Sequence, residues 1–133
     1  MYVIVMGIFL ILHGLVHLLY AGQSWRMFEL RPQMTWPDGS WLISKIFSQE
    51  IVRMLAGVSL VISTLGFLAC GVGLFLRQAW WQPSTLAAAV FSMLVFVIFW
   101  DGKSKELADQ GGVGVLIDLA ILAAILIFHW PSV

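Results

Sequence analysis

The chain has 133 residues, of which 61% are hydrophobic and only 11% are charged. Soluble domains carry about 25% charged residues, so this composition excludes an ordinary soluble protein. The seven basic and seven acidic residues balance, which gives no indication of a nucleic-acid partner. The length fits a single domain, residues 1–133.

Four apolar segments, at about residues 2–21, 50–76, 83–100 and 113–130, make up most of the chain. A bilayer core of about 30 Å is crossed by roughly 20 helical residues, and each segment has about that length. The first segment has no basic stretch before its apolar part and is therefore expected to be retained rather than cleaved as a signal peptide. The sequence predicts an all-α integral membrane protein with an up-down bundle of four transmembrane helices.

The 28-residue segment from Gly22 to Gln49 is the longest connection between these helices. Its Trp-Pro-Asp-Gly stretch at residues 36–39 is a turn signal, because proline presets φ. Apolar and charged residues alternate on both sides of this turn. That mixture favours short amphipathic helices lying in the headgroup region.

The distribution of basic residues predicts the orientation in the cell membrane. Basic residues in short loops prefer the cytoplasm. Arg77 is the only basic residue in the loop between the second and third helices. The other basic residues lie in or beside the first and third loops. We therefore expect these two loops in the cytoplasm and both termini outside. The remaining basic residues are Arg26, Arg31, Lys45, Arg53, Lys103 and Lys105.

Small residues recur at helical spacing in the apolar segments and would allow helices to approach closely. Examples are Ser63, Gly66 and Cys70 in the second segment, and Ala88 and Ser92 in the third. They favour a compact bundle surrounded by membrane lipids. Such a row of small residues on one helix is equally suited to packing against another copy of the chain in a homo-oligomer, or against another subunit of a larger membrane complex.

Ionisable residues inside the apolar segments are the candidates for a functional site. His13, His17 and Tyr20 share one helical face, and Asp118 falls at a depth between the two histidines. An ionisable group at the centre of a membrane helix costs about 2.5–3.5 kcal/mol, so such groups are expected to face one another. We predict that the first and fourth helices adjoin, with Asp118 accepting a hydrogen bond from His13 or His17.

Charged residues at the helix ends extend this predicted network. Arg53, near the start of the second helix, is expected to reach the same region with its long side chain. Its predicted carboxylate partner is Glu50, Asp101 or Asp118.

Several interpretations of this cluster remain open from the sequence. It can be a structural network in a scaffold without a ligand. It can be the polar end of a site for a quinone, a lipid or another lipophilic molecule, or a contact for a partner membrane subunit. Histidine and aspartate side chains can also form a proton relay.

Metal or haem ligation is the last interpretation, with His13, His17 and Asp118 as ligands in a membrane oxidoreductase component. His13 and His17 have the i, i+4 spacing by which one helix presents two imidazoles to an ion. Two histidines one turn apart cannot occupy opposite axial positions of one haem. No serine or cysteine lies beside the histidines in a way that predicts nucleophilic catalysis, so no catalytic residue is expected.

The stretch LHGLVHL at residues 12–18 resembles small four-helix bacterial membrane proteins of the DoxX-like kind. The hydropathy pattern of the first three helices is similar too, including the Trp100-Asp101 end of the third. The resemblance implies an antiparallel bundle in a bacterial cytoplasmic membrane. It also implies an accessory role beside quinone-linked oxidoreductases.

Overall fold

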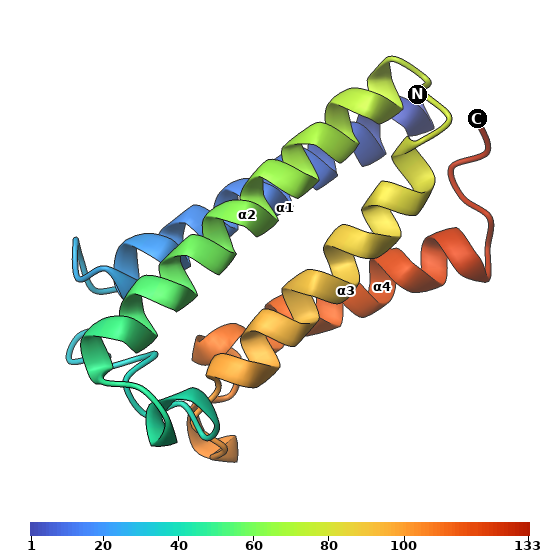
Figure 1. The fold of residues 1–133 in the computed structure, drawn as a ribbon. Helices are drawn as coiled ribbons and strands as arrows, with labels where there is room; N and C mark the ends of the chain where they lie inside the picture. The colour runs from blue at the N-terminus through green and yellow to red at the C-terminus, as the bar shows by residue number, and fades with distance from the viewer.

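The computed structural model describes all residues, 1–133, and is all-α. Its four helices are α1 (Tyr2–Ser24), α2 (Gln49–Phe75), α3 (Trp81–Phe99) and α4 (Val113–Leu126). They pack up and down in chain order (Figure 1). Each is long and apolar enough to cross a membrane, α4 together with the irregular turn Ala108–Gly112 that precedes it. The predicted fold class is confirmed.

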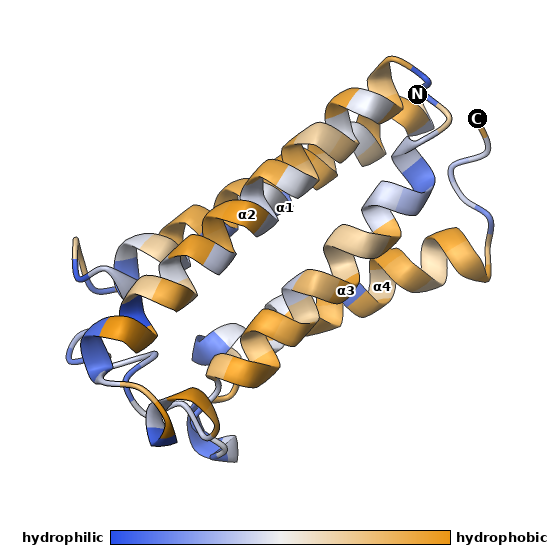
Figure 2. Ribbon diagram, viewed as in Figure 1, coloured by the Kyte–Doolittle hydropathy of each residue, from blue (hydrophilic) through white to orange (hydrophobic).

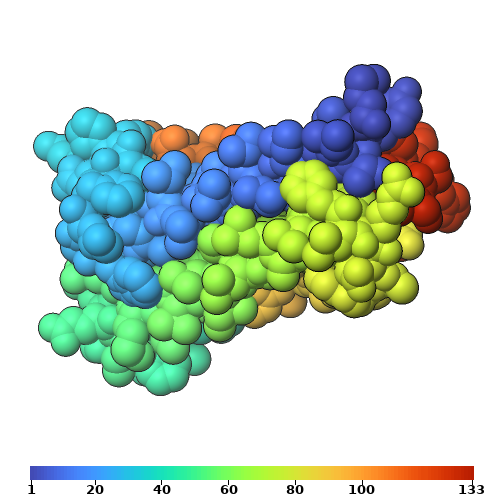
Figure 3. Space-filling model, turned by 90° about the horizontal axis from the view of Figure 1, so that it is seen from above, coloured from blue at the N-terminus to red at the C-terminus, as the bar shows by residue number.

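The loops alternate between the two ends of the bundle. The α1–α2 and α3–α4 connections lie at one end, and both termini lie at the other with the short α2–α3 turn (Figure 1). The view from above also places the first and last residues together, opposite the α1–α2 loop (Figure 3). We call these the loop end and the terminal end.

The helix pairs differ in how closely they pack. The α1–α2 contact is the most extensive, followed by α2–α3 and α3–α4, whereas the backbones of α1 and α4 barely approach one another. Glycines explain the first contact: a Cβ at Gly14 would lie 2.8 Å from Phe67 Cβ, and one at Gly71 would lie 2.9 Å from the Gly7 carbonyl oxygen. Without side chains there, the two helices come close enough for extensive van der Waals contact.

The helix boundaries differ from the prediction most clearly at the end of α4. The fourth helix was expected to reach residue 130 but ends at Leu126. His129 has a φ of +50°, and the Trp130 N–H bonds back to the Ala124 carbonyl, which closes the helix end. Pro131 also disfavours helical backbone at the residue before it. At the start of the fourth span, the turn Ala108–Gly112 adds the length that the span loses by ending at Leu126.

The predicted amphipathic helices in the α1–α2 loop are wrong. Residues 25–48 form turns and bends, with a single 3₁₀ turn at Ile43–Lys45. Pro32 and Pro37 cannot continue a helix, and Arg26 and Gln33 have positive φ, which also ends helical backbone. The predicted turn at residues 36–39 is present.

Two apolar clusters fill the interior, one toward each end of the bundle. Leu10, Phe67 and Ile121 belong to the cluster at the terminal end, and Leu60 and Phe96 belong to the cluster at the loop end. The outward helix faces are apolar as well, while hydrophilic residues gather mainly at the loop end (Figure 2). Apolar surfaces this extensive are unusual on soluble proteins and are suited to contact with lipid.

Gly14→Ala is expected to destabilise the bundle, because its Cβ would press on the α2 backbone and on Phe67. We expect the free energy of unfolding in detergent to fall by roughly 1–3 kcal/mol. Gly66→Ala is the matched control, since a Cβ there has only an ordinary 3.5 Å contact with Ala88. Equal stabilities for the two variants would contradict the close-packed α1–α2 contact.

Candidate functional site

A layer of buried polar side chains separates the two apolar clusters. His13 and His17 come from α1, Ser92 from α3 and Asp118 from α4. Their exposed fractions are small: 6% for His13, 1% for His17, and zero for Ser92 and Asp118. The layer is therefore closed on all sides, and the predicted opening toward the loop end is not present.

His13 and Asp118 form a hydrogen-bonded pair that joins α1 to α4. His13 Nε2 lies 2.8 Å from Asp118 Oδ1. The prediction that Asp118 accepts from one of the two histidines is confirmed for His13. Because the α1 and α4 backbones barely approach one another, this pair is the main polar link between these helices.

His17 forms two hydrogen bonds, neither of them to Asp118. Its Nδ1 lies 2.8 Å from the His13 carbonyl oxygen, and its Nε2 lies 2.8 Å from Ser92 Oγ. A carbonyl only accepts, so Nδ1 carries the proton, and the Nε2 of the neutral ring accepts from the serine hydroxyl. Both ring nitrogens are thus satisfied, and His17 joins α1 to α3. Ser92, considered only as a small packing residue in the sequence, is its partner, so the expectation that no serine lies beside the histidines is wrong.

Aromatic rings enclose both imidazoles. Phe67 lies edge-on to His13 with ring centroids 4.8 Å apart, and Phe96 lies 5.6 Å from His17. Phe9 stacks parallel to His13 at 6.1 Å. In such apolar surroundings a hydrogen bond is strong and a polar atom without a partner is costly.

The second carboxylate oxygen of Asp118 has no hydrogen-bond partner. Asp118 Oδ2 is buried and makes no hydrogen bond. A buried acceptor left unsatisfied costs about 1–3 kcal/mol. The other unpaired buried atom, Trp36 Nε1, lies in the apolar cluster at the loop end. Only Asp118 combines an unpaired atom with a place in the polar layer.

A crevice lies between α1 and α4, about one helical turn from the His13–Asp118 pair, and neither residue of the pair lines it. It has a volume of about 290 Å³ and is entirely apolar. Phe9 lines it one helical turn before His13, and Ile121 lines it three residues after Asp118. The remaining lining residues are Val5, Met6, Ala120, Ala124 and Trp130.

The predicted partners of Arg53 are wrong. Its guanidinium forms a two-point contact with Asp38, with Nε 2.7 Å from Oδ1 and Nη2 2.8 Å from Oδ2. Arg26 reaches the same carboxylate at 2.7 Å. Asp38 belongs to the turn at residues 36–39, which lies against the start of α2 and brings its carboxylate within reach.

The other residues predicted for the network lie apart from the His13–Asp118 pair. Glu50 is exposed at the start of α2 and has no ion-pair partner. Asp101 binds Gln110 through its backbone N–H and its Oδ2, both at 3.0 Å. Tyr20 lies among aromatic rings, with its centroid 5.5 Å from Trp36 and 5.1 Å from Phe96.

The donor set does not fit a metal ion. No group of three or more His, Cys, Asp or Glu side chains is arranged to hold one. The Nε2 atom of His17 turns to Ser92, on a different helix from Asp118. A site with His13, His17 and Asp118 as ligands would require both histidines to abandon their hydrogen bonds.

Comparisons with known proteins give no relative. No protein-family model matches the chain, and neither a curated protein nor a solved structure matches it. The resemblance to DoxX-like proteins receives no support from these comparisons and stays a prediction. The site is therefore interpreted from its own geometry.

Asp38→Asn is expected to flatten the dependence of stability on acidic pH. Burial alone would raise the pKa of the Asp38 carboxyl, but hydrogen bonds from Arg53 and Arg26 outweigh it and hold the pKa below its ordinary value of 3.8. The stability that this carboxylate contributes is present above its unfolded pKa and is lost as the pH falls toward its folded pKa.

Thermal unfolding in detergent, followed from about pH 5 downward, measures this loss. The wild type should lose more stability than Asp38→Asn over this range. Glu50→Gln is the control, because it removes an exposed carboxylate without an ion-pair partner, and it should behave like the wild type. Parallel curves for the wild type and Asp38→Asn would contradict the role of the two arginines.

Proposed function

We propose that this protein is an integral membrane protein that binds a lipophilic molecule in the α1–α4 crevice, with the polar head of the molecule at the His13–Asp118 pair. The unpaired Asp118 Oδ2 is the observation that carries the proposal. A buried oxygen without a partner is destabilising. A ligand that supplies the missing hydrogen bond removes that cost and gains binding energy.

The chemistry of the pair favours a ligand with a hydroxyl group. A carboxylate oxygen accepts hydrogen bonds, and Oδ1 of Asp118 is already paired with His13 Nε2. The other oxygen, Oδ2, therefore suits a donor. The hydroxyl of a hydroquinone combines this donor with an aromatic ring and an apolar tail.

The crevice would hold the apolar part of such a molecule, because its lining is entirely hydrophobic. Neither His13 nor Asp118 lines the crevice and Asp118 is fully buried, so the head reaches Oδ2 only when a lining side chain moves aside. Phe9 lies between the crevice and the pair, because it lines the crevice and stacks on His13. Sites for small molecules generally combine an apolar lining with a few placed polar groups.

In the cell membrane, we propose that the loop end faces the cytoplasm and that both termini lie outside. The α1–α2 and α3–α4 loops share this end. Arg77, the one basic residue at the terminal end, lies in the short turn before α3. Short loops rich in lysine and arginine stay in the cytoplasm.

A purely structural role for the polar layer is the second candidate. It is favoured by His17, which is fully hydrogen-bonded and buried between α1 and α3. Polar pairs between membrane helices can fix their register without binding a ligand. In that case the polar layer would have no function beyond holding the helices together.

Ala124→Phe is expected to weaken ligand binding by filling the crevice. The probe is a hydroquinone with a short alkyl tail, titrated into detergent-solubilised protein and measured by calorimetry. We expect an increase in Kd of at least about tenfold, a loss of about 1.4 kcal/mol. Ala123→Phe is the matched control, since Ala123 is the neighbouring residue and does not line the crevice.

The same titration separates the ligand-binding role from the structural one. The dimethyl ether of the probe lacks the hydroxyl donors, and Asp118→Asn removes the carboxylate, so each is expected to weaken binding by about tenfold or more. Tighter binding of the corresponding quinone would contradict the donor assignment. If the probe binds neither the wild type nor the variants, the structural role is correct.

A further inference from the structure

Aromatic rings from the α1–α2 loop lie over glycines of α1 and α2 at the loop end. A Cβ at Gly22 would collide with the Phe28 ring, and one at Gly57 would collide with the Trp25 indole. Trp25 directly follows α1 and lies against the third turn of α2. Both rings are also exposed, so each lies against helix backbone and remains open to the surroundings of the bundle.

The terminal end has the same arrangement. A Cβ at Gly7 of α1 would collide with the Phe75 ring, and one at Gly73 of α2 would collide with the exposed Trp80 indole. At 1.5 Å per residue, Gly57 and Gly73 are about 24 Å apart along α2. A hydrocarbon core of about 30 Å would place the rings at both ends just inside its edges. Tryptophan gathers at this depth because its indole is apolar and its N–H needs a polar partner.

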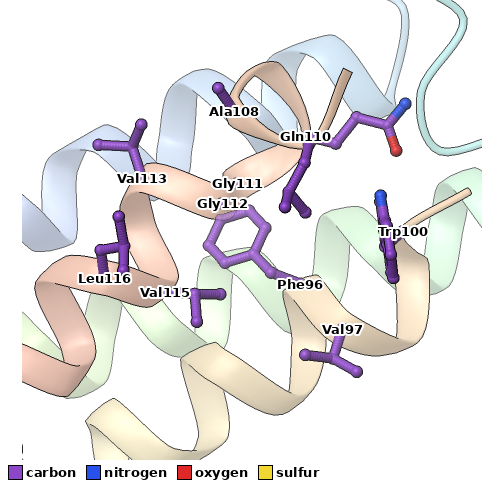
Figure 4. A pocket seen from close by; sticks show the side chains of 11 residues that line it. Phe96, Val97, Trp100, Ala108, Gln110, Gly111, Gly112, Val113, Val115 and Leu116 are labelled. Carbon is purple, nitrogen blue, oxygen red and sulfur yellow. The ribbon is translucent and has the colours of Figure 1, made fainter. Parts of the chain in front are cut away.

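Two further indoles lie against α3 at the loop end. Trp41 Nε1 donates to the Val97 carbonyl oxygen at 2.6 Å, and the Trp41 backbone N–H donates to the Trp100 carbonyl oxygen at 2.8 Å. Trp100 Nε1 donates to the Lys103 carbonyl oxygen at 3.0 Å. Figure 4 shows Trp100 at the end of α3, beside the largest cavity of the molecule, which has a volume of about 410 Å³. Rings of the α1–α2 loop thus lie against α1, α2 and α3.

The break before α4 lies at the level of these rings. Within Ala108–Gly112, Gln110 and Gly111 depart from helical geometry, and Gly111 has a φ of +97°. Figure 4 shows Gln110 next to Trp100. Irregular backbone within the depth of a membrane is tolerated only where it is buried in protein or lines a cavity, and both Gln110 and Gly111 are buried. The regular part of α4 therefore begins where the rings of the other three helices lie.

The rest of the α1–α2 loop exposes apolar side chains beside these rings. Met27 is 72% exposed and Ile46 is 67% exposed, and Leu42 and Phe47 are exposed as well. None of the four belongs to either apolar cluster of the interior. Large exposed apolar groups mark a contact with a protein or a membrane. Through Trp25, which lies on α2, this surface is continuous with the apolar outward faces of the helices.

The charges at the loop end balance. The chain has seven basic and seven acidic residues, and all except Arg77 and Asp118 lie at or beside the loop end. Equal numbers of both signs give no preference for an anionic lipid over a zwitterionic one. A contact of this loop with lipid would therefore depend on its apolar side chains.

We propose that the α1–α2 loop is a membrane-contacting element, with residues 25–47 in the headgroup region of the leaflet at the loop end and their exposed apolar side chains in lipid. The bilayer is the occupant that the structure favours, because the loop surface continues the outward helix faces at the level of the aromatic rings. The proposal rests on the bundle spanning a membrane. It does not involve the crevice between α1 and α4, so it stands or fails independently of the ligand.

Nitroxide labels measure the depth of the loop. Cys70 is the only cysteine and is buried, so single cysteines replace Met27 or Ile46 in a Cys70→Ala background. The full chain is reconstituted into phosphatidylcholine vesicles. Paramagnetic resonance then compares the accessibility of each label to oxygen, which concentrates in lipid, with its accessibility to a water-soluble nickel chelate. Ser104→Cys, in the exposed α3–α4 connection, is the aqueous reference, and Leu65→Cys, exposed on the middle of α2, is the lipid reference.

The two loop labels should give an oxygen-to-nickel ratio several times that of Ser104→Cys and below that of Leu65→Cys. Ratios equal to that of Ser104→Cys would place the loop in water and overturn the proposal, and ratios equal to that of Leu65→Cys would overturn the headgroup depth. Labels shielded from both reagents would show that a second copy or another protein covers the loop, which would also overturn it. A water-like ratio at Leu65→Cys would contradict the membrane-spanning bundle as well.

Changing the lipid and the loop tests whether apolar contact holds the loop in place. The Ile46→Cys label should give the same ratio in vesicles with and without phosphatidylglycerol, because the charges at the loop end balance. The double variant Leu42→Gln/Phe47→Gln should shift this ratio toward the aqueous reference. Lys45→Gln is the matched control, because it changes an exposed polar residue of the same segment, and it should leave the ratio unchanged. A lipid-like ratio found only with phosphatidylglycerol, or one unchanged in the double variant, would overturn the apolar contact.

Discussion

One buried hydrogen bond, between His13 on α1 and Asp118 on α4, links the first and last helices of this bundle. An apolar interior offers no other partner to an imidazole or a carboxylate, so each of the two groups would be destabilising alone. The bond satisfies Nε2 of one side chain and Oδ1 of the other. It also closes the bundle where the backbones of the first and last helices scarcely approach one another.

The contacts between helices are made in different ways, and the candidate site follows from the difference. Glycines such as Gly14 and Gly71 let α1 and α2 pack closely, so no space is left between them. His17 and Ser92 supply a satisfied polar link from α1 to α3. Between α1 and α4 the link is polar but the packing is loose, which leaves both the crevice and the unpaired oxygen of Asp118.

Much of this architecture was predictable from the sequence, because spans of this length and hydropathy have few alternatives in a bilayer. The His13–Asp118 pair was predictable as well, since the cost of isolated polar groups demands a partner at similar depth. The partner of Arg53 was not predictable, because it depends on how the turn bearing Asp38 folds against α2. The break near Gly111 also escaped prediction, since two adjacent glycines indicate a weak point in a helix without specifying its geometry.

A double-mutant cycle between His13 and Asp118 tests the central claim most directly. His13→Leu and Asp118→Leu each leave one buried polar partner unsatisfied and should each lower the free energy of unfolding in detergent by roughly 1–3 kcal/mol. The double variant replaces the pair with apolar groups and should be nearly as stable as the wild type, which corresponds to strong coupling. A double variant whose loss equals the sum of the two single losses would contradict the account.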